Sequence, residues 1–129
     1  MSGYLVDTSV ALIAVDTPER LSPNVRTAVL SGSSYLSIIS YWEVMIKSRK
    51  GLLDVGDPRL WWAETLDALL AQPLPFRPEH ISAIYDLPAI HHDPFDPALI
   101  AQATVEHLTF LTTDVRVAQY ASERFRVMR

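Results

Sequence analysis

The sequence predicts a three-layer α/β/α fold, in which helices cover both faces of a mostly parallel central sheet of about five strands. Short apolar segments, typical of buried strands, alternate along the chain with longer segments of helical character. This alternation requires right-handed crossovers between parallel strands, which place helices on both faces of the sheet. The chain has 129 residues, of which 49% are hydrophobic. We therefore expect one domain, residues 1–129, with a substantial core.

Local signals set the expected elements. We expect strands at residues 4–6, 35–39, near 74–76, 109–111 and 125–128, and helices at residues 10–15, 23–30, 41–50, 58–71, 78–85, 97–107 and 115–121. Pro23 and Pro97 stand where a helix tolerates proline, in its first turn. Pro73 and Pro75 restrict the segment near Leu74 to an edge strand, because proline cannot donate a hydrogen bond to a central ladder.

Composition narrows the function classes. The absence of cysteine excludes disulfides, thiolate metal sites and cysteine nucleophiles, and it fits a reducing compartment. No apolar run is long enough to span a membrane, and the first residues lack the pattern of a signal peptide, so we expect a cytoplasmic protein. A net charge of −4 is unusual for a simple nucleic-acid-binding module. A cluster of four site carboxylates would account for that whole surplus.

Acidic residues fall where the expected strands end or the following helices begin. They are Asp7, Glu43 in the first helical turn after the second strand, Asp93 and Asp96 before the helix at Pro97, and Asp114. In a parallel sheet these positions open on one edge, so residues distant in sequence converge there. Oxygen-only ligands suit Mg²⁺ or Mn²⁺, and two such ions can hydrolyse a phosphodiester bond. The pattern therefore predicts a metal-dependent hydrolytic site.

Each acid also has a purely structural interpretation, in which it caps a helix or shapes a loop. Asp7 and Asp114 stand where N-caps stand, and Ser40 with Glu43 matches a capping box. Asp96 before Pro97 would cap the helix that begins there, and Asp93 would then be a loop former. Capping does not explain why four such acids fall at the same edge of one sheet, but both interpretations stay open on the residues alone.

Four sequence blocks resemble the motifs of PIN-domain ribonucleases, in particular VapC toxins of bacterial type II toxin–antitoxin pairs. The blocks are Leu5–Ser9, residues 37–47 (SIISYWEVMIK), residues 91–103 (HHDPFDPALIAQA) and residues 111–114 (LTTD). They occur in the family's order and, with their flanks, span residues 5–120. The third block is the most specific of the four.

The resemblance implies a PIN-like fold and an endoribonuclease that hydrolyses RNA with water activated by Mg²⁺, or by Mn²⁺. Its acidic set is Asp7, Glu43, Asp96 and Asp114, with Asp93 as an additional metal ligand. Between Asp93 and Asp96 we favour Asp96 as the main ligand, because it directly abuts the helix. Thr8 and Thr112 would orient a carboxylate or a metal-bound water. The family further implies a homodimer and a small VapB-like antitoxin that blocks the active site.

Two positions depart from the family pattern. Pro97 stands where the subgroup has Arg after the second Asp, and Thr113 stands at a position that is often basic. If those bases contact RNA phosphates, the enzyme would be slower or differently selective. Lys47, Arg49 and Lys50 are candidate RNA contacts, although the basic end of a solvated helix explains them as well.

Other features carry weaker signals. His91 and His92 do not share a helix face, so a loop role is favoured over zinc binding. Trp61 and Trp62 cannot both face one core, so one of them is a candidate interface residue. Alternation along an edge strand explains the arginines near the end as well as RNA binding does; these are Arg124, Arg126 and Arg129.

Two alternatives belong to other functional classes. An Mg²⁺-dependent aspartyl phosphatase or receiver domain would use Asp7 as nucleophile, but Ser9 stands where a phosphatase needs a second Asp. A receiver would also need a lysine after a late strand, and residues 112–114 offer none. An inactive PIN-like binding module is the second alternative, which the intact set of acids disfavours.

Overall fold

The computed structural model describes residues 2–88 and 93–129 and contains a five-stranded, all-parallel sheet in the order β3-β2-β1-β4-β5. The strands are β1 (Tyr4–Val6), β2 (Ser34–Ser37), β3 (Gln72–Leu74), β4 (Thr109–Leu111) and β5 (Val127–Met128). The chain runs outward from β1 through β2 to β3 at one edge, and then returns to β4 on the other side of β1. This reversal creates a topological switch point at the carboxyl ends of β1 and β4.

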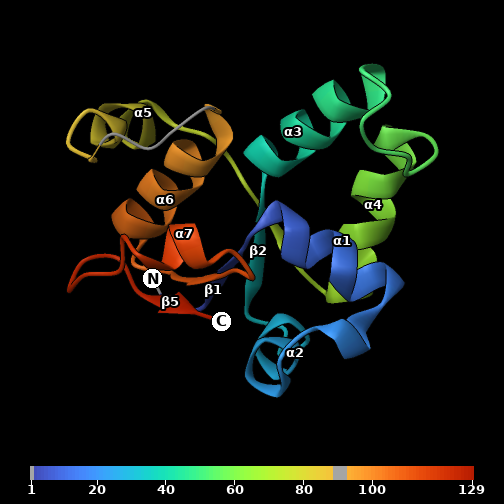
Figure 1. Ribbon diagram of the computed structural model, residues 1–129, viewed down its shortest axis with the longest axis horizontal. Coiled ribbons are helices and arrows are strands. Elements are labelled where there is room, and N and C mark those ends of the chain that lie inside the picture. Colours follow the sequence, from blue (N-terminus) through green and yellow to red (C-terminus); the bar gives the residue numbers. More distant parts are fainter. Residues whose placement is uncertain (1, 89–92) are drawn as a thin grey trace.

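Helices form the outer layers (Figure 1). They are α1 (Thr8–Asp16), the short 3₁₀ helix η1 (Pro18–Arg20), α2 (Pro23–Val29), α3 (Ile38–Arg49), α4 (Pro58–Leu69), α5 (Pro78–Ile84), α6 (Phe95–Glu106) and α7 (Val115–Ala118). The expected α/β class, the parallel sheet and the edge position of the strand at Leu74 are confirmed. Among the residues that the structure describes, no helix is long and apolar enough to cross a membrane.

The sheet separates two apolar cores, because successive side chains of a strand face opposite sides. Leu5 and Phe110 face one core, which they share with Leu99 of α6. Val6 and Leu111 face the other core, together with residues of α1, α2 and α4. The three expected layers are therefore present.

Helix α3 begins earlier than the sequence suggested. Ser37 is its N-cap, and the Ser37 hydroxyl accepts a hydrogen bond from the Ile39 amide at 2.9 Å. The expected capping box of Ser40 and Glu43 is therefore wrong, and Glu43 lies in the second helical turn rather than the first. Ile38 and Ile39 read as a continuing strand because they are β-branched, but the cap at Ser37 ends the strand before them.

Helix α6 also begins earlier, at Phe95 rather than Pro97. Its N-cap residue is Pro94, and the Oδ1 atom of Asp93, one residue earlier, accepts hydrogen bonds from the amides of Phe95 (2.8 Å) and Asp96 (2.9 Å). The expected cap at Asp96 is wrong. Pro97 is still tolerated, because the first amides of a helix have no partner within the helix. A loop was expected at residues 88–96, and a loop role was expected for His91 and His92. Residues 89–92, which include both histidines, lie outside the described residues.

Both adjacent tryptophans pack against other residues of the chain. Trp61 is buried in the core on the α1, α2 and α4 side. Trp62 stacks on Tyr41 of α3, with ring centroids 4.9 Å apart. Leu60 and Leu70 are exposed, because the face of α4 that packs inward is formed by Trp61, Thr65 and Leu69.

Candidate active site

Asp7 lies between β1 and α1 at the switch point of the sheet. Although it occupies the N-cap position of α1, its side chain makes no capping hydrogen bond. Only 6% of the residue is exposed, and the Thr112 hydroxyl donates a 2.7 Å hydrogen bond to its Oδ2 atom. The same Thr112 oxygen accepts a hydrogen bond from the Asp114 amide at 3.0 Å. Thr112 therefore connects the turn after β4 to the carboxylate after β1.

Glu43 reaches the same region from α3 and is 8% exposed. Thr8 Oγ1 lies 2.8 Å from Glu43 Oε1 and 2.8 Å from Ser40 Oγ. Lys47, one helical turn along α3, forms an ion pair with Glu43 Oε2. Ser40 is thus a buried contact between α1 and α3 rather than a helix cap, a role that its sequence context did not indicate.

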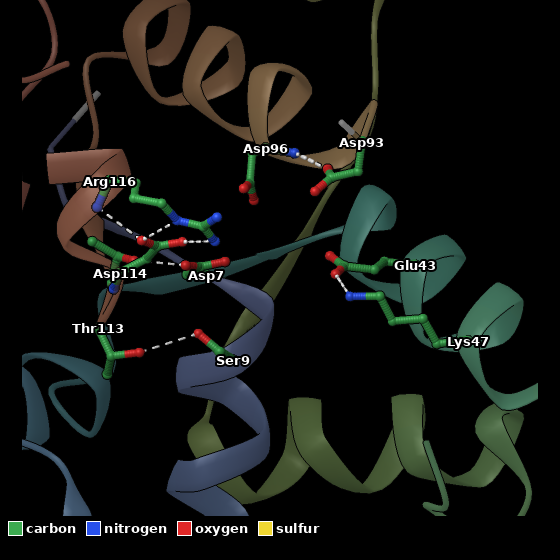
Figure 2. A network of polar contacts seen from close by, with 10 residues as sticks. Asp7, Ser9, Glu43, Lys47, Asp93, Asp96, Thr113, Asp114 and Arg116 are labelled. Atoms are coloured by element: carbon green, nitrogen blue, oxygen red, sulfur yellow. Dashed lines mark hydrogen bonds and ion pairs between the residues drawn. The ribbon is translucent and has the colours of Figure 1, made fainter. Parts of the chain in front are cut away.

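Asp93 and Asp96 have separate roles at the start of α6. One oxygen of Asp93 is engaged by two backbone amides, which holds the loop against the helix. The Asp96 carboxylate points from the first turn of α6 toward Asp7 and Asp114 (Figure 2). The geometry therefore places Asp96, the residue favoured from the sequence, closer to the centre of the acidic group.

Asp114 caps α7 and is paired with a cation from the same helix. Its Oδ1 accepts hydrogen bonds from the Arg116 amide (2.8 Å) and Nε (3.3 Å), and Arg116 Nη2 lies 3.1 Å from Oδ2. The Arg116 side chain holds the pKa of Asp114 below its ordinary value. Sequence reasoning missed Arg116, although an Asp-x-Arg pattern at a helix start was visible in residues 114–116.

Burial and like charge act together on two of the acids. Burial raises the pKa of Asp7 to about 6, and repulsion from Glu43 and Asp114 adds to the rise, against the opposing hydrogen bond from Thr112. Burial likewise raises the pKa of Asp96 to about 7, with repulsion from Asp93, Asp7, Glu43 and Asp114. Five acids from four segments of the chain are therefore close enough to influence one another.

The PIN-domain family model matches residues 4–123 of the chain. The chain belongs to the PIN-domain family. This membership confirms the family that the four sequence blocks indicated, and it covers every member of the acidic group. No curated protein matches the sequence.

Several solved structures share the fold of this PIN domain. A chain of the DNA-bound VapBC complex from Salmonella typhimurium is 15% identical, with a TM-score of 0.68 over 99% of this chain and 98% of that chain. A chain of VapBC2 from Rickettsia felis, bound to a promoter DNA fragment, is 14% identical, with a TM-score of 0.67 over 99% of this chain and 98% of that chain. A chain of FitAcB from Neisseria gonorrhoeae is 22% identical, with a TM-score of 0.61 over 98% of this chain and 96% of that chain. At these identities the similarity concerns the fold.

The acids of this PIN domain fit a hydrated Mg²⁺ ion better than a tightly bound metal. Within residues 2–88 and 93–129, no three His, Cys, Asp or Glu side chains form a ready-made metal site. Mg²⁺ does not require one, because it binds through one or two carboxylates and keeps several waters. The donors here are carboxylate oxygens, and Asp7 and Asp96 are destabilised as anions by their surroundings. A divalent cation would relieve that repulsion.

The three candidate RNA contacts on α3 differ in position. Lys47 lies at the acidic group, where its bond to Glu43 and the charges of Glu43, Asp93 and Asp96 outweigh burial and raise its pKa. Arg49 and Lys50 are exposed at the C-terminal end of the helix. Of the arginines near the C-terminal end of the chain, Arg126 donates a 2.8 Å hydrogen bond to the His107 carbonyl, away from the acids.

Proposed function

We propose that this PIN domain, residues 1–129, is a metal-dependent endoribonuclease of the VapC toxin type, acting in the cytoplasm on RNA phosphodiester bonds. The observation that carries the proposal is the electrostatics of Asp7 and Asp96. Each is an acid with a raised pKa that lies within the influence of other carboxylates of the group. Such an arrangement is costly for stability and becomes favourable when a cation binds.

Asp7 and Asp96 would hold Mg²⁺, or Mn²⁺, with Glu43, Asp114 and Asp93 completing the acidic group. When bound, the metal supplies an activated water and stabilises the charge that develops on the departing oxygen. Thr112 fixes the Asp7 carboxylate through its 2.7 Å hydrogen bond, and Thr8 fixes Glu43 at 2.8 Å. These hydroxyls orient the carboxylates before substrate arrives, which is the usual task of groups just behind metal ligands.

The proposed partners follow from the fold and the acids together. The similar structures are described as VapBC and FitAB-type complexes, and we propose a VapB-like antitoxin and a homodimer for this chain as well. An antitoxin Arg or Lys would be attracted to the uncompensated carboxylates as a metal ion is. Inhibition would then weaken as Mg²⁺ rises.

The test is cleavage of total cellular RNA by purified protein with Mg²⁺ and with chelator, followed by mapping of the new ends. We expect defined ends that appear only with Mg²⁺. A receiver or aspartyl phosphatase would instead become phosphorylated on Asp7 by a small phosphodonor and leave RNA intact. An inactive PIN-like module would do neither, and either result would reject the proposal.

A further inference from the structure

Arg116 carries a positive charge within the acidic group, and the proposed ribonuclease function assigns it no role. Its guanidinium forms a two-armed contact with Asp114, through Nε at 3.3 Å and Nη2 at 3.1 Å. Its side chain is nevertheless 78% exposed. Figure 2 shows the guanidinium beside Asp114, on the side that faces Asp96. Arg116 is therefore held by one acid while it remains accessible to a ligand that enters the site.

The chain contains a second copy of this contact, away from the site. Asp57 caps α4 and accepts hydrogen bonds from the Arg59 amide (2.9 Å), Nε (3.0 Å) and Nη2 (2.8 Å). Arg59 is as exposed as Arg116, at 75%. The two-armed contact is therefore a local consequence of an Asp-x-Arg sequence at a helix start, and by itself it indicates no function.

The surroundings distinguish the two arginines. The hydrogen bond and charge of Asp57 raise the pKa of Arg59, and no acid of the active site is among the causes. The corresponding bond to Asp114 raises the pKa of Arg116, but Asp96 and Asp93 act on it as well. Arg116 is thus close to the two acids at the start of α6, Asp96 and Asp93, whereas Arg59 is not.

We propose that Arg116 binds a phosphate of the RNA backbone: it pairs with Asp114 in the free protein and moves to the phosphate when RNA enters, which leaves Asp114 free for the cation. The proposal rests on the proposed ribonuclease function. A guanidinium matches phosphate as well as carboxylate, with two parallel N–H donors. Pro97 and Thr113 carry no positive charge, whereas Arg116 supplies one beside Asp114.

The first measurement concerns the cation and uses no RNA. Mn²⁺ binding is titrated by calorimetry for wild type, Arg116→Ala and Arg59→Ala. Removal of Arg116 should tighten Mn²⁺ binding about three- to tenfold, because a fixed positive charge beside the carboxylates is lost. Arg59→Ala, which removes the same contact from another helix, should leave Mn²⁺ affinity at the wild-type value. Equal melting temperatures of the two variants would show that the loss of a cap contact affects both equally.

The second measurement concerns RNA. Binding of a labelled single-stranded RNA of mixed sequence is followed at several salt concentrations, in chelator and in an Asp7→Asn background, so that the RNA stays intact. Adding Arg116→Ala should weaken binding and lower the slope of log affinity against log salt by about 0.7, the value for one phosphate contact on a single strand. Adding Arg59→Ala should leave both quantities unchanged.

The outcomes separate this proposal from the ribonuclease function. If Arg116→Ala behaves as Arg59→Ala in both measurements, the contact at Asp114 is only a helix cap and the proposal is wrong. If Mn²⁺ affinity rises but the salt slope stays constant, Arg116 does not bind RNA, and the proposal is equally wrong. Failure of the wild type to cut RNA with Mg²⁺ would reject the ribonuclease function, while the two binding measurements would still decide the role of Arg116.

Discussion

Two regions of the molecule bury ionisable side chains, and they do so in opposite ways. Between α5 and α6, His80 is completely buried. Its Nε2 lies 2.8 Å from Glu106 Oε2, and its Nδ1 accepts a hydrogen bond from the Arg77 amide at 3.0 Å. At the carboxyl ends of the strands, Asp7 and Asp96 are instead surrounded by other carboxylates. The first arrangement stabilises a helix contact, and the second lowers the stability of the protein as long as no cation neutralises the acids.

The largest expected difference between the two regions is in catalysis. Asp7→Asn or Asp96→Asn should lower Mg²⁺-dependent RNA cleavage by more than about 100-fold, since removal of a mere supporting group already costs 10- to 100-fold. Circular dichroism and melting should show an intact fold in both variants. Asp93→Asn should have a smaller effect, because one oxygen of Asp93 is already engaged by two backbone amides at the start of α6. Wild-type cleavage by Asp7→Asn would rule out the metal-site model.

The sequence predicted some structural elements of the molecule better than others. The sequence predicted the parallel sheet from the alternation of strand and helix segments along the chain. It predicted the convergence of the acids from their positions at the ends of those segments. Both signals are properties of whole segments. The starts of α3 and α6 could not be predicted in this way. Ser37 and Ser40, and likewise Asp93 and Asp96, are residues of the same type three positions apart, and either could accept hydrogen bonds from the first amides of the helix. Which member of each pair does so depends on packing. Arg116 was missed because its contact is local and common, and only its neighbours across the site distinguish it.

A second difference concerns pH and the chelated protein. The pKa of Asp7 is raised to about 6 from 3.8, so the folded state binds a proton more tightly than the unfolded state. The stabilisation from that proton is complete below pH 3.8 and is lost as pH rises through about 6. Urea unfolding of the metal-free wild type should show a loss of stability across this window, to which Asp7 contributes up to about 3 kcal/mol.

Asp7→Asn provides the control for this pH dependence, because its amide oxygen can still accept the Thr112 hydrogen bond while carrying no charge. The variant should lack the part of the loss that Asp7 contributes, whereas the part that Asp96 contributes remains. At pH 7 the variant should therefore be on the order of 1–3 kcal/mol more stable than chelated wild type. Saturating Mg²⁺ should stabilise wild type and affect the variant much less. A chelated wild type that melts no lower than Asp7→Asn would show that the acids do not repel one another.

The His80 region should respond in the reverse sense. His80→Ala removes both of its hydrogen bonds and leaves a cavity between α5 and α6, so the free energy of unfolding should fall by about 2–3 kcal/mol. Cleavage per folded molecule should stay within about twofold of wild type, because the change lies outside the acidic group. Denaturant titration and RNA cleavage on the same preparation would check both. Loss of cleavage without loss of stability would mean that the two regions are not separate.

The smallest effect is expected within the acidic group itself, at Glu43. Its charge is already matched by Lys47, which forms an ion pair with Oε2. Asp7, in contrast, accepts its side-chain hydrogen bond from the neutral Thr112 hydroxyl, and it forms no ion pair within the described residues. Glu43→Gln keeps an oxygen that can accept from Thr8, and it loses both the repulsion toward Asp7 and the attraction to Lys47. These changes oppose each other, so the stability of the chelated protein should shift by less than about 1 kcal/mol.

Glu43→Ala should be less stable than Glu43→Gln, because the Thr8 hydroxyl loses its buried carboxylate partner. Paired melts of the two variants with Lys47→Met would test the compensation. If Glu43→Gln gained as much stability as Asp7→Asn, Lys47 would not be neutralising Glu43, and the contrast between the compensated and uncompensated acids would fail.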